Sequence, residues 1–179
     1  MRNIVLFMFH RPDLTWRDIQ HICVQTAQLV NPEDPDWETT AAGRPFSYKY
    51  GYGKIDAYHY VTAAKTWQNV KPQAWVDIPA IQIAGGTMDT FQNMTGGELI
   101  VTGGISSSAS VTQSMLDDAN FEKLEHVTAK VWISHERRGD VEVQIVSPGG
   151  IKSVLAGPRK SDSASTGYPG WTFMTIKHW

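Results

Sequence analysis

Apolar residues near the start of the chain recur every three or four positions, which is the spacing of one face of an α-helix. The residues on this face are Trp16, Ile19, Ile22, Cys23, Ala27 and Val30. Thr15 and Asp18 have the spacing of a helix-capping pair, in which the hydroxyl binds an amide of the first turn. The pattern therefore predicts a helix over residues 15–29, which Asn31-Pro32 would end.

A second apolar stripe follows the flexible bend Tyr50–Gly53. Its members share one helical face and are Ala57, Tyr60, Val61, Ala64 and Trp67. Asp56 lies at the start of this stripe, where the positive end of a helix favours an anion. We therefore expect a second helix that ends at Trp67, and no helical residues after it.

Beyond Pro72 the period of the pattern changes to the alternation that is typical of strands. The predicted strands are Val127–Ile133, Val141–Ile145, Ile151–Leu155 and Trp171–Ile176. The segment His135–Asp140 would join the first two as a hairpin, and Ser147–Gly150 supplies the next turn. The C-terminal part is therefore expected to be an all-β sandwich or barrel built from hairpins.

The segment Pro79–Gly104 is rich in Gly and Thr and has no sustained period, so it is interpreted as a surface linker. Within it, Asn93-Met94-Thr95 matches the acceptor pattern for N-glycosylation. Asn93 is therefore a glycosylation candidate if the protein is secreted.

Composition narrows the function classes. With 179 residues the chain has room for one or two domains, and 41% hydrophobic residues suffice for a core. Sixteen Lys and Arg against eighteen Asp and Glu give a net charge of −2, which lacks the positive surface of a nucleic-acid-binding protein. The single cysteine, Cys23, excludes an internal disulfide framework and a multi-thiolate metal site.

Targeting signals are weak. The apolar run Ile4–Phe9 is shorter than the ~7–15 residues of a signal-peptide core, and no small-residue cleavage site follows it. No segment approaches the ~20 apolar residues of a membrane span. We therefore expect no signal peptide and no transmembrane segment in this chain.

Short motifs do not form a catalytic or metal site. His135–Gly139 begins like a zinc-protease helix, but Gly139 stands where the second histidine is needed. The acidic run Asn31–Asp36 lacks the alternating spacing of a calcium loop and is interpreted as a solvated loop. Arg138-Gly139-Asp140 is interpreted as a turn, and the hairpin would shield the dibasic pair Arg137-Arg138 from proteases.

Two early passages, Asp13–Gln20 and Tyr48–Ala57, resemble the last stretch of the catalytic domain of kexin-type, subtilisin-like proteases. Four later passages are similar to the P domain (Homo B domain) that follows it in kexin and furin-like proprotein convertases: Asn120–Thr128, Arg137–Asp140, Ser147–Gly150 and Trp171–Met174. The resemblance extends from Pro12 to Trp179, matches least in the linker, and is nearest to fungal kexins.

The resemblance implies three regions. Residues 1–75 would be a helical remnant of a subtilisin-like α/β catalytic domain, residues 76–110 a linker, and residues 111–179 an all-β jelly-roll sandwich, the P domain. Both ends are expected to be truncated, because residues 1–11 match poorly and the family's P domain continues past a motif like His178-Trp179.

The family resemblance also implies a function. The family consists of calcium-dependent (Ca2+) serine endopeptidases that cut precursors after paired basic residues. The resemblance therefore implies a protein of the secretory pathway, in the Golgi lumen or membrane. The partner would be the subtilisin-like catalytic domain in cis. The family's catalytic aspartate, histidine, oxyanion asparagine and serine motifs do not occur here, so no catalytic, substrate-binding or metal-binding residue is carried over. The chain alone is expected to be inactive.

We therefore expect a structural role for this chain. Arg138 and Asp140 are interpreted as a charge pair at a hairpin tip that holds the strands together, and Trp171 as a structural residue of the last strand. Without the rest of a catalytic domain, the apolar side chains of Trp16, Ile19 and Trp67 are expected to face nothing. Two alternatives stay open, namely a free-standing β-sandwich module that binds a sugar or peptide, and a non-catalytic regulator of a convertase.

Overall fold

The computed structural model describes residues 11–179, and the chain divides into two units between Pro72 and Gln73. The run Ile4–Phe9, which was compared with a signal peptide, lies outside the described residues. Within residues 11–179, no helix has the length and apolar character needed to cross a membrane.

The first unit begins with helix α2 (Trp16–Thr26), whose start is a complete capping box. The Thr15 hydroxyl accepts a hydrogen bond from the Asp18 amide at 3.2 Å, and the Asp18 carboxylate accepts one from the Thr15 amide at 2.8 Å. The predicted start of the helix is therefore confirmed. The helix ends before residue 29, because Ala27 is extended and Gln28 pairs with Lys54 in an isolated β-bridge.

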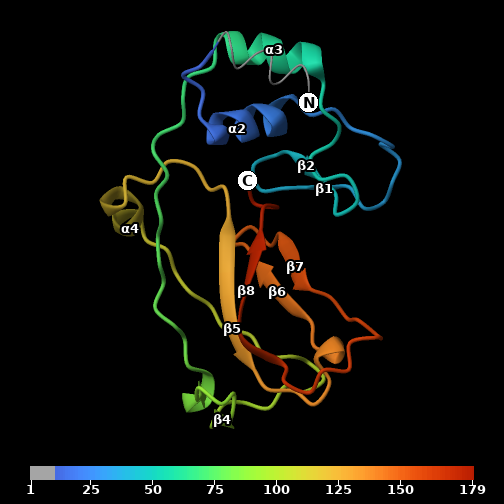
Figure 1. Ribbon diagram of the computed structural model, residues 1–179, viewed down its shortest axis with the longest axis vertical. Helices are drawn as coiled ribbons and strands as arrows, with labels where there is room; N and C mark the ends of the chain where they lie inside the picture. The colour runs from blue at the N-terminus through green and yellow to red at the C-terminus, as the bar shows by residue number, and fades with distance from the viewer. Residues whose placement is uncertain (1–10) are drawn as a thin grey trace. The chain divides into compact units, whose positions relative to one another are not determined.

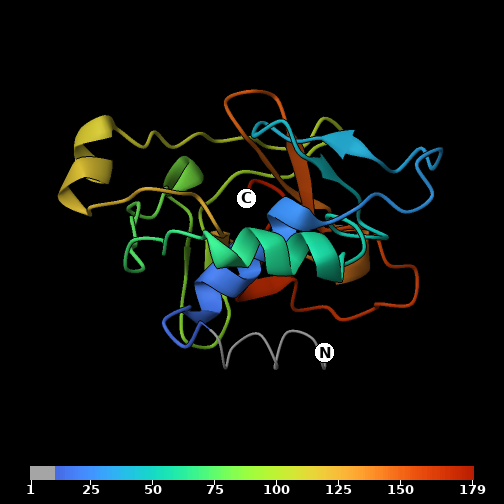
Figure 2. The same ribbon diagram turned by 90° about the horizontal axis from the view of Figure 1, so that it is seen from above.

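Helix α3 (Ala57–Lys65) confirms the second predicted helix, with Asp56 as its N-cap. Between the helices, strands β1 (Glu38–Thr39) and β2 (Pro45–Phe46) form a short antiparallel pair. Helices α2 and α3 lie side by side in both views (Figures 1 and 2). Their shared core consists of Leu14, Ile22, Tyr60 and Ala64, with Ile19, Cys23, Val61, Ala63 and Trp67 packed around it.

This core corrects one expectation about unburied apolar residues. Ile19 and Trp67 are partly buried against the two-helix core, because α2 and α3 cover each other's apolar faces. Trp16 is not among the residues packed on that core and is 55% exposed. Burial also raises the pKa of the Cys23 thiol, which fits a thiol on the apolar face of α2.

The second unit begins with a stretch of short elements. These are the 3₁₀ turn η1 (Ile83–Gly85), strands β3 (Thr87–Met88) and β4 (Met94–Thr95), and helix α4 (Gln113–Asp118). Helix α4 shows that the expectation of no helix beyond Trp67 is wrong. Thr112 caps α4 by accepting a hydrogen bond from the Met115 amide at 3.3 Å. This helix was not predicted, because its residues lack a clear apolar stripe.

The rest of the second unit is strand-rich. Its strands are β5 (Val127–Ile133), β6 (Val143–Val146), β7 (Lys152–Ala156) and β8 (Tyr168–Thr175), with the 3₁₀ turn η2 (Arg138–Asp140) between β5 and β6. Strand β5 pairs with β8, and β6 pairs with β7, both antiparallel (Figure 1). The β6–β7 hairpin is therefore inserted in the chain between the two strands of the other pair.

This pairing corrects the predicted connection of the first two strands. The expected hairpin of β5 with β6 is wrong, because β5 pairs with β8 and η2 leads the chain from one strand pair to the other. The turn Ser147–Gly150 does close the β6–β7 hairpin, with the Gly150 amide bound to the Ser147 carbonyl at 2.9 Å. Both pairs contribute to one core, formed by Val141, Ala156 and Tyr168 with Val131, Ile133, Val143 and Phe173 packed against it.

Candidate functional site

Asp162, in the loop between β7 and β8, binds two arginine side chains. Its Oδ2 accepts hydrogen bonds from Arg138 Nε at 2.8 Å and from Arg159 Nη2 at 2.9 Å, and its Oδ1 accepts one from Arg138 Nη2 at 3.0 Å. Hydrogen bonds from Arg138 and then Arg159 hold the pKa of the Asp162 carboxyl well below its usual value. We call Arg138, Arg159 and Asp162 the arginine–aspartate cluster.

Aromatic side chains of β8 support this cluster. The Arg138 guanidinium lies 4.7 Å from the centroid of the Trp171 ring, a cation–π arrangement. Arg159 Nη2 donates a hydrogen bond to the Tyr168 hydroxyl at 2.7 Å. Because Tyr168 is fully buried and stacks edge-on with Trp171, the cluster is connected directly to the core between the strand pairs.

Backbone hydrogen bonds hold the same two segments together. The Gly139 amide donates to the Asp162 carbonyl at 3.0 Å, and the Arg159 amide donates to the Gly139 carbonyl at 2.8 Å. The Arg138 amide donates to the Ala164 carbonyl at 2.8 Å. Two residues of η2, Arg138 and Gly139, are therefore bound through their backbone to the β7–β8 loop.

The three residues to which the sequence analysis assigned structural roles have different environments. Arg138 pairs with Asp162 and stacks on Trp171. Asp140 is 55% exposed, and its Oδ1 lies 3.6 Å from Arg137 Nε. Arg138 and Trp171 thus share one contact region, while the expected pairing of Arg138 with Asp140 does not form. The contribution of each residue to stability stays a prediction.

Sequence reasoning missed Arg159 and Asp162. Both lie in a segment of Ser, Ala, Gly and Pro that has the composition of an ordinary loop. The sequence offered one indication of this pair, because Arg159 and Asp162 are three positions apart and can form a local ion pair. Nothing in the local pattern indicated that Arg138, 24 residues from Asp162, would join them.

Asn93 lies on the exposed tip of the β3–β4 hairpin. Its side-chain amide donates to Asp89 Oδ2 at 3.0 Å, and its backbone amide donates to Asp89 Oδ1 at 2.9 Å. The position is open to solvent, as a glycan acceptor must be, and its glycosylation stays a prediction.

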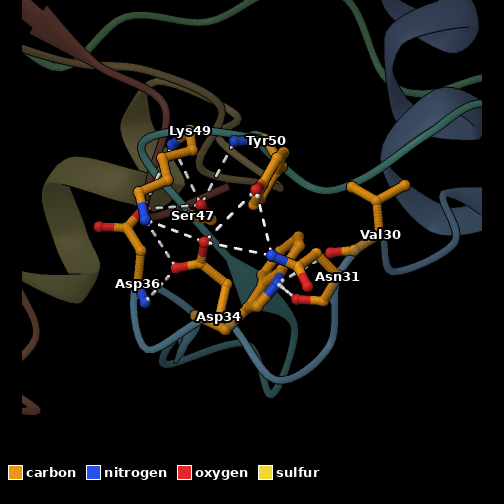
Figure 3. Close-up of polar contacts among 8 residues, drawn as sticks. Val30, Asn31, Asp34, Asp36, Ser47, Lys49 and Tyr50 are labelled. Atoms are coloured by element: carbon orange, nitrogen blue, oxygen red, sulfur yellow. Dashed lines mark hydrogen bonds and ion pairs between the residues drawn. The ribbon is translucent and has the colours of Figure 1, made fainter.

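The acidic loop of the first unit is more ordered than a solvated loop (Figure 3). Asp34 is only 9% exposed and accepts hydrogen bonds from Lys49 Nζ at 2.8 and 2.9 Å. Asp36 Oδ2 accepts one from the Ser47 hydroxyl at 2.7 Å. These bonds lower the pKa of both carboxyl groups, that of Asp34 through Lys49 and that of Asp36 through Ser47. Both carboxylates therefore act as internal ligands of the loop.

Metal binding has no support in the part of the chain that the structure describes. Residues 11–179 include no group of three or more His, Cys, Asp or Glu side chains placed to hold a metal ion. Among these residues the structure thus shows no carboxylate group of this kind for the Ca2+ that the family resemblance implies.

Comparison with known proteins gives a consistent assignment. Residues 124–179 match the model of the proprotein convertase P-domain. The chain is 43% identical over 171 residues to a dibasic-processing endoprotease of Schizosaccharomyces pombe. This alignment covers 94% of this chain and 23% of that protein. It is 38% identical over 175 residues to kexin of Saccharomyces cerevisiae, and that alignment covers 97% of this chain and 20% of kexin. The chain is a kexin-like segment with a proprotein convertase P domain.

A solved structure supports the fold. The crystal structure of a serine protease of Aeromonas sobria matches 99% of this chain and 33% of that protein, with a TM-score of 0.63 and 20% identity. The arginine–aspartate cluster lies within the residues that match the P domain, whereas Asn93 precedes them. The kexin-like segment spans about a fifth of the length of these curated relatives.

Proposed function

We propose that this chain is the stabilising C-terminal portion of a dibasic-processing serine endoprotease. Residues 1–75 would complete a subtilisin-like catalytic domain, residues 76–110 would link it to the next domain, and residues 111–179 would form a jelly-roll P domain. The full protease would cut precursors after paired basic residues in the secretory pathway. Catalytic groups, substrate pockets and Ca2+ ligands would belong to the catalytic domain in cis.

The observation that carries this proposal is an exposed apolar stretch at the start of the second unit. Within residues 75–111, Trp75 is 63% exposed, Phe91 85% and Leu99 86%. We interpret this run of exposed apolar side chains along one segment of the chain as a contact surface. The relatives are about four to five times as long as the matched segment, and one of them is named a dibasic-processing endoprotease. We propose that a catalytic domain in cis covers this stretch.

Exposed apolar side chains of the first unit also favour coverage by a catalytic domain in cis. Trp16 and Tyr58 are 55% and 76% exposed, although both belong to helices with well-packed opposite faces. A helix pair with apolar side chains on its outer face fits the edge of a larger domain. At ~25 cal/mol per Å2, covering such side chains would add several kcal/mol to stability.

The proposal can be tested with a chimera of S. cerevisiae kexin in which this chain replaces the matching segment. We expect the chimera to cleave a Lys-Arg fluorogenic peptide, and kexin without the segment to be inactive. The double substitution Phe91→Ser and Leu99→Ser should reduce secreted activity, because both side chains would lie in the covered surface. The matched control is Val146→Thr, which changes a residue of β6 that is 55% exposed.

Two outcomes would contradict the proposal. The first is a chimera that is secreted and folded but gains no activity from this chain. The second is cleavage of the Lys-Arg peptide by the purified chain alone, together with labelling by an active-site phosphonate, because the chain would then be catalytic itself.

A further inference from the structure

Two dibasic sequences lie next to each other in the P domain. Arg137-Arg138 belongs to the turn after β5, and Arg159-Lys160 belongs to the β7–β8 loop. Arg137 Nη2 donates a hydrogen bond to the Lys160 carbonyl at 2.6 Å, so the two pairs touch each other directly. In Figure 1 the turn and the loop both lie at the end of the strand-rich unit where β5 stops. Each pair is a recognition sequence for the kind of protease that the relatives are named for.

The peptide bond after the first pair is covered by the second segment. A Cβ atom at Gly139 would lie 2.1 Å from the Arg159 carbonyl oxygen and 2.5 Å from that of Asp162. The amides of Arg138 and Gly139 and the Gly139 carbonyl are all hydrogen-bonded to the β7–β8 loop. An endoprotease needs its substrate extended, with free backbone groups for strand-like pairing. The Arg138–Gly139 bond meets neither requirement.

The second pair is also held in a bent conformation. The Asp162 amide donates to the Arg159 carbonyl at 3.0 Å, which places Lys160 and Ser161 at the centre of a tight turn. The Arg159 guanidinium is bound to Asp162, to the Gly157 carbonyl and to the Tyr168 hydroxyl. A protease pocket that reads this arginine would first have to remove it from three partners.

Asp162 is the residue common to both pairs. Its carboxylate binds the side chains of Arg138 and Arg159, and its backbone carbonyl binds the Gly139 amide. Asp140 lies two residues from Arg138 in sequence, yet it binds neither of these two arginines in the cluster. Removing the Asp162 charge would leave two guanidinium groups close together without the anion between them.

We propose that Asp162 protects the P domain from dibasic-specific cleavage by holding both basic pairs in a closed, mutually covered arrangement. When the cluster opens, a dibasic-specific serine protease would hydrolyse the Arg138–Gly139 or Lys160–Ser161 amide. One water molecule would be consumed, leaving a carboxylate on the basic residue and a new amino terminus on the next one. The physiological relevance rests on the proposed function, because a catalytic domain in cis would be the nearest such protease.

The test uses the full chain as a substrate for the purified dibasic-processing endoprotease of S. pombe. Wild-type protein is compared with Asp162→Asn and with the matched control Asp140→Asn, and mass spectrometry identifies new termini at Gly139 and Ser161. Because cleavage follows the population of the open state, we expect Asp162→Asn to be cut at least about tenfold faster than the other two. Cleavage of wild type at the rate of Asp162→Asn would overturn the proposal.

Two further measurements separate local opening from general unfolding. Chymotrypsin, which cuts after aromatic residues, reports the general loss of stability in Asp162→Asn and should therefore be accelerated much less by this substitution than the dibasic-specific protease is. An equal acceleration by both proteases would overturn the proposal, because protection would then be a property of the whole fold. Arg138→Lys keeps a dibasic sequence but loses the two-pronged bond to Asp162, so it should also be cut faster than wild type.

These results can be told apart from a failure of the proposed function. The protease is added from outside, so the cleavage assay does not require that this chain support a catalytic domain. An inactive kexin chimera with a protected wild-type chain would contradict only the proposed function. An active chimera with an unprotected wild-type chain would contradict only the role of Asp162.

Discussion

The carboxylate of Asp18 in α2 accepts a hydrogen bond from the indole nitrogen of Trp67 at 2.9 Å. The same oxygen accepts the Val70 amide at 2.7 Å, while the other oxygen binds the amide and hydroxyl of Thr15. Asp18 is fully buried, and its pKa is lowered because these hydrogen bonds outweigh desolvation. One side chain thus caps α2 and fastens the chain that follows α3.

Replacing Asp18 with Asn should destabilise the first unit. An amide side chain accepts hydrogen bonds at only one end, so either the donors of Thr15 or those of Trp67 and Val70 would lose their acceptor in a buried site. We expect a loss of about 1–3 kcal/mol in the free energy of unfolding, measured with urea by tryptophan fluorescence. Asp13→Asn, which changes an exposed ion pair with Arg11, should have a much smaller effect. Equal effects of the two substitutions would refute this role of Asp18.

Substitution of Gly139 should be among the most damaging changes in the second unit. Its missing side chain leaves room for the backbone of Arg159 and Asp162, which cannot move away without breaking the bonds to η2. Gly139→Ala is expected to cost at least about 3 kcal/mol of stability, measured by thermal unfolding. The control is Gly149→Ala, where the nearest atom to a new Cβ is the Ser147 hydroxyl at 3.9 Å. A near-neutral Gly139→Ala would show that the two segments separate easily.

A buried hydroxyl pair links β7 with β8. Ser153 Oγ lies 2.6 Å from Thr175 Oγ1, which also accepts the Lys177 amide at 3.1 Å. Thr175→Val keeps the shape but removes the partner of two polar groups, so we expect a loss of about 1–3 kcal/mol in unfolding free energy. Adding Ser153→Ala should cost less than the sum of the single changes, since both remove one interaction. Strict additivity in urea unfolding would mean that the hydroxyls do not interact.

The two helices could be predicted from sequence because their signals are local. Thr15 and Asp18 lie within one helical turn, as do the apolar residues that form each stripe. Strand β5 was also predicted with the observed bounds, because its alternation is a property of seven consecutive residues. The helix end at Thr26 was missed, because Gln28 forms a bridge with the distant Lys54.

Strand partners and the arginine–aspartate cluster depend on long-range contacts. The alternation in β5 indicates which side chains face the core, but it does not distinguish β6 from β8 as the partner. Arg138 was matched with Asp140 because the two are neighbours in sequence, whereas folding brings Asp162 to it across 24 positions. Gly139 permits the close approach of the Arg159 and Asp162 backbone, but from the sequence alone it could be interpreted only as a turn residue.

The stability of the second unit should fall in acid through Asp162. Its pKa is held below the ordinary value of 3.8 by Arg138 and Arg159, so the unfolded chain takes up a proton before the folded one does. Its contribution is therefore complete above about pH 5 and is lost as the pH falls toward the depressed pKa of the folded state. We expect the stability difference between wild type and Asp162→Asn to be constant from about pH 5 to 7 and to shrink below about pH 4. Urea unfolding at a series of pH values measures this difference, and a gap that stays constant down to about pH 2 would exclude the ionised Asp162 carboxylate as its source.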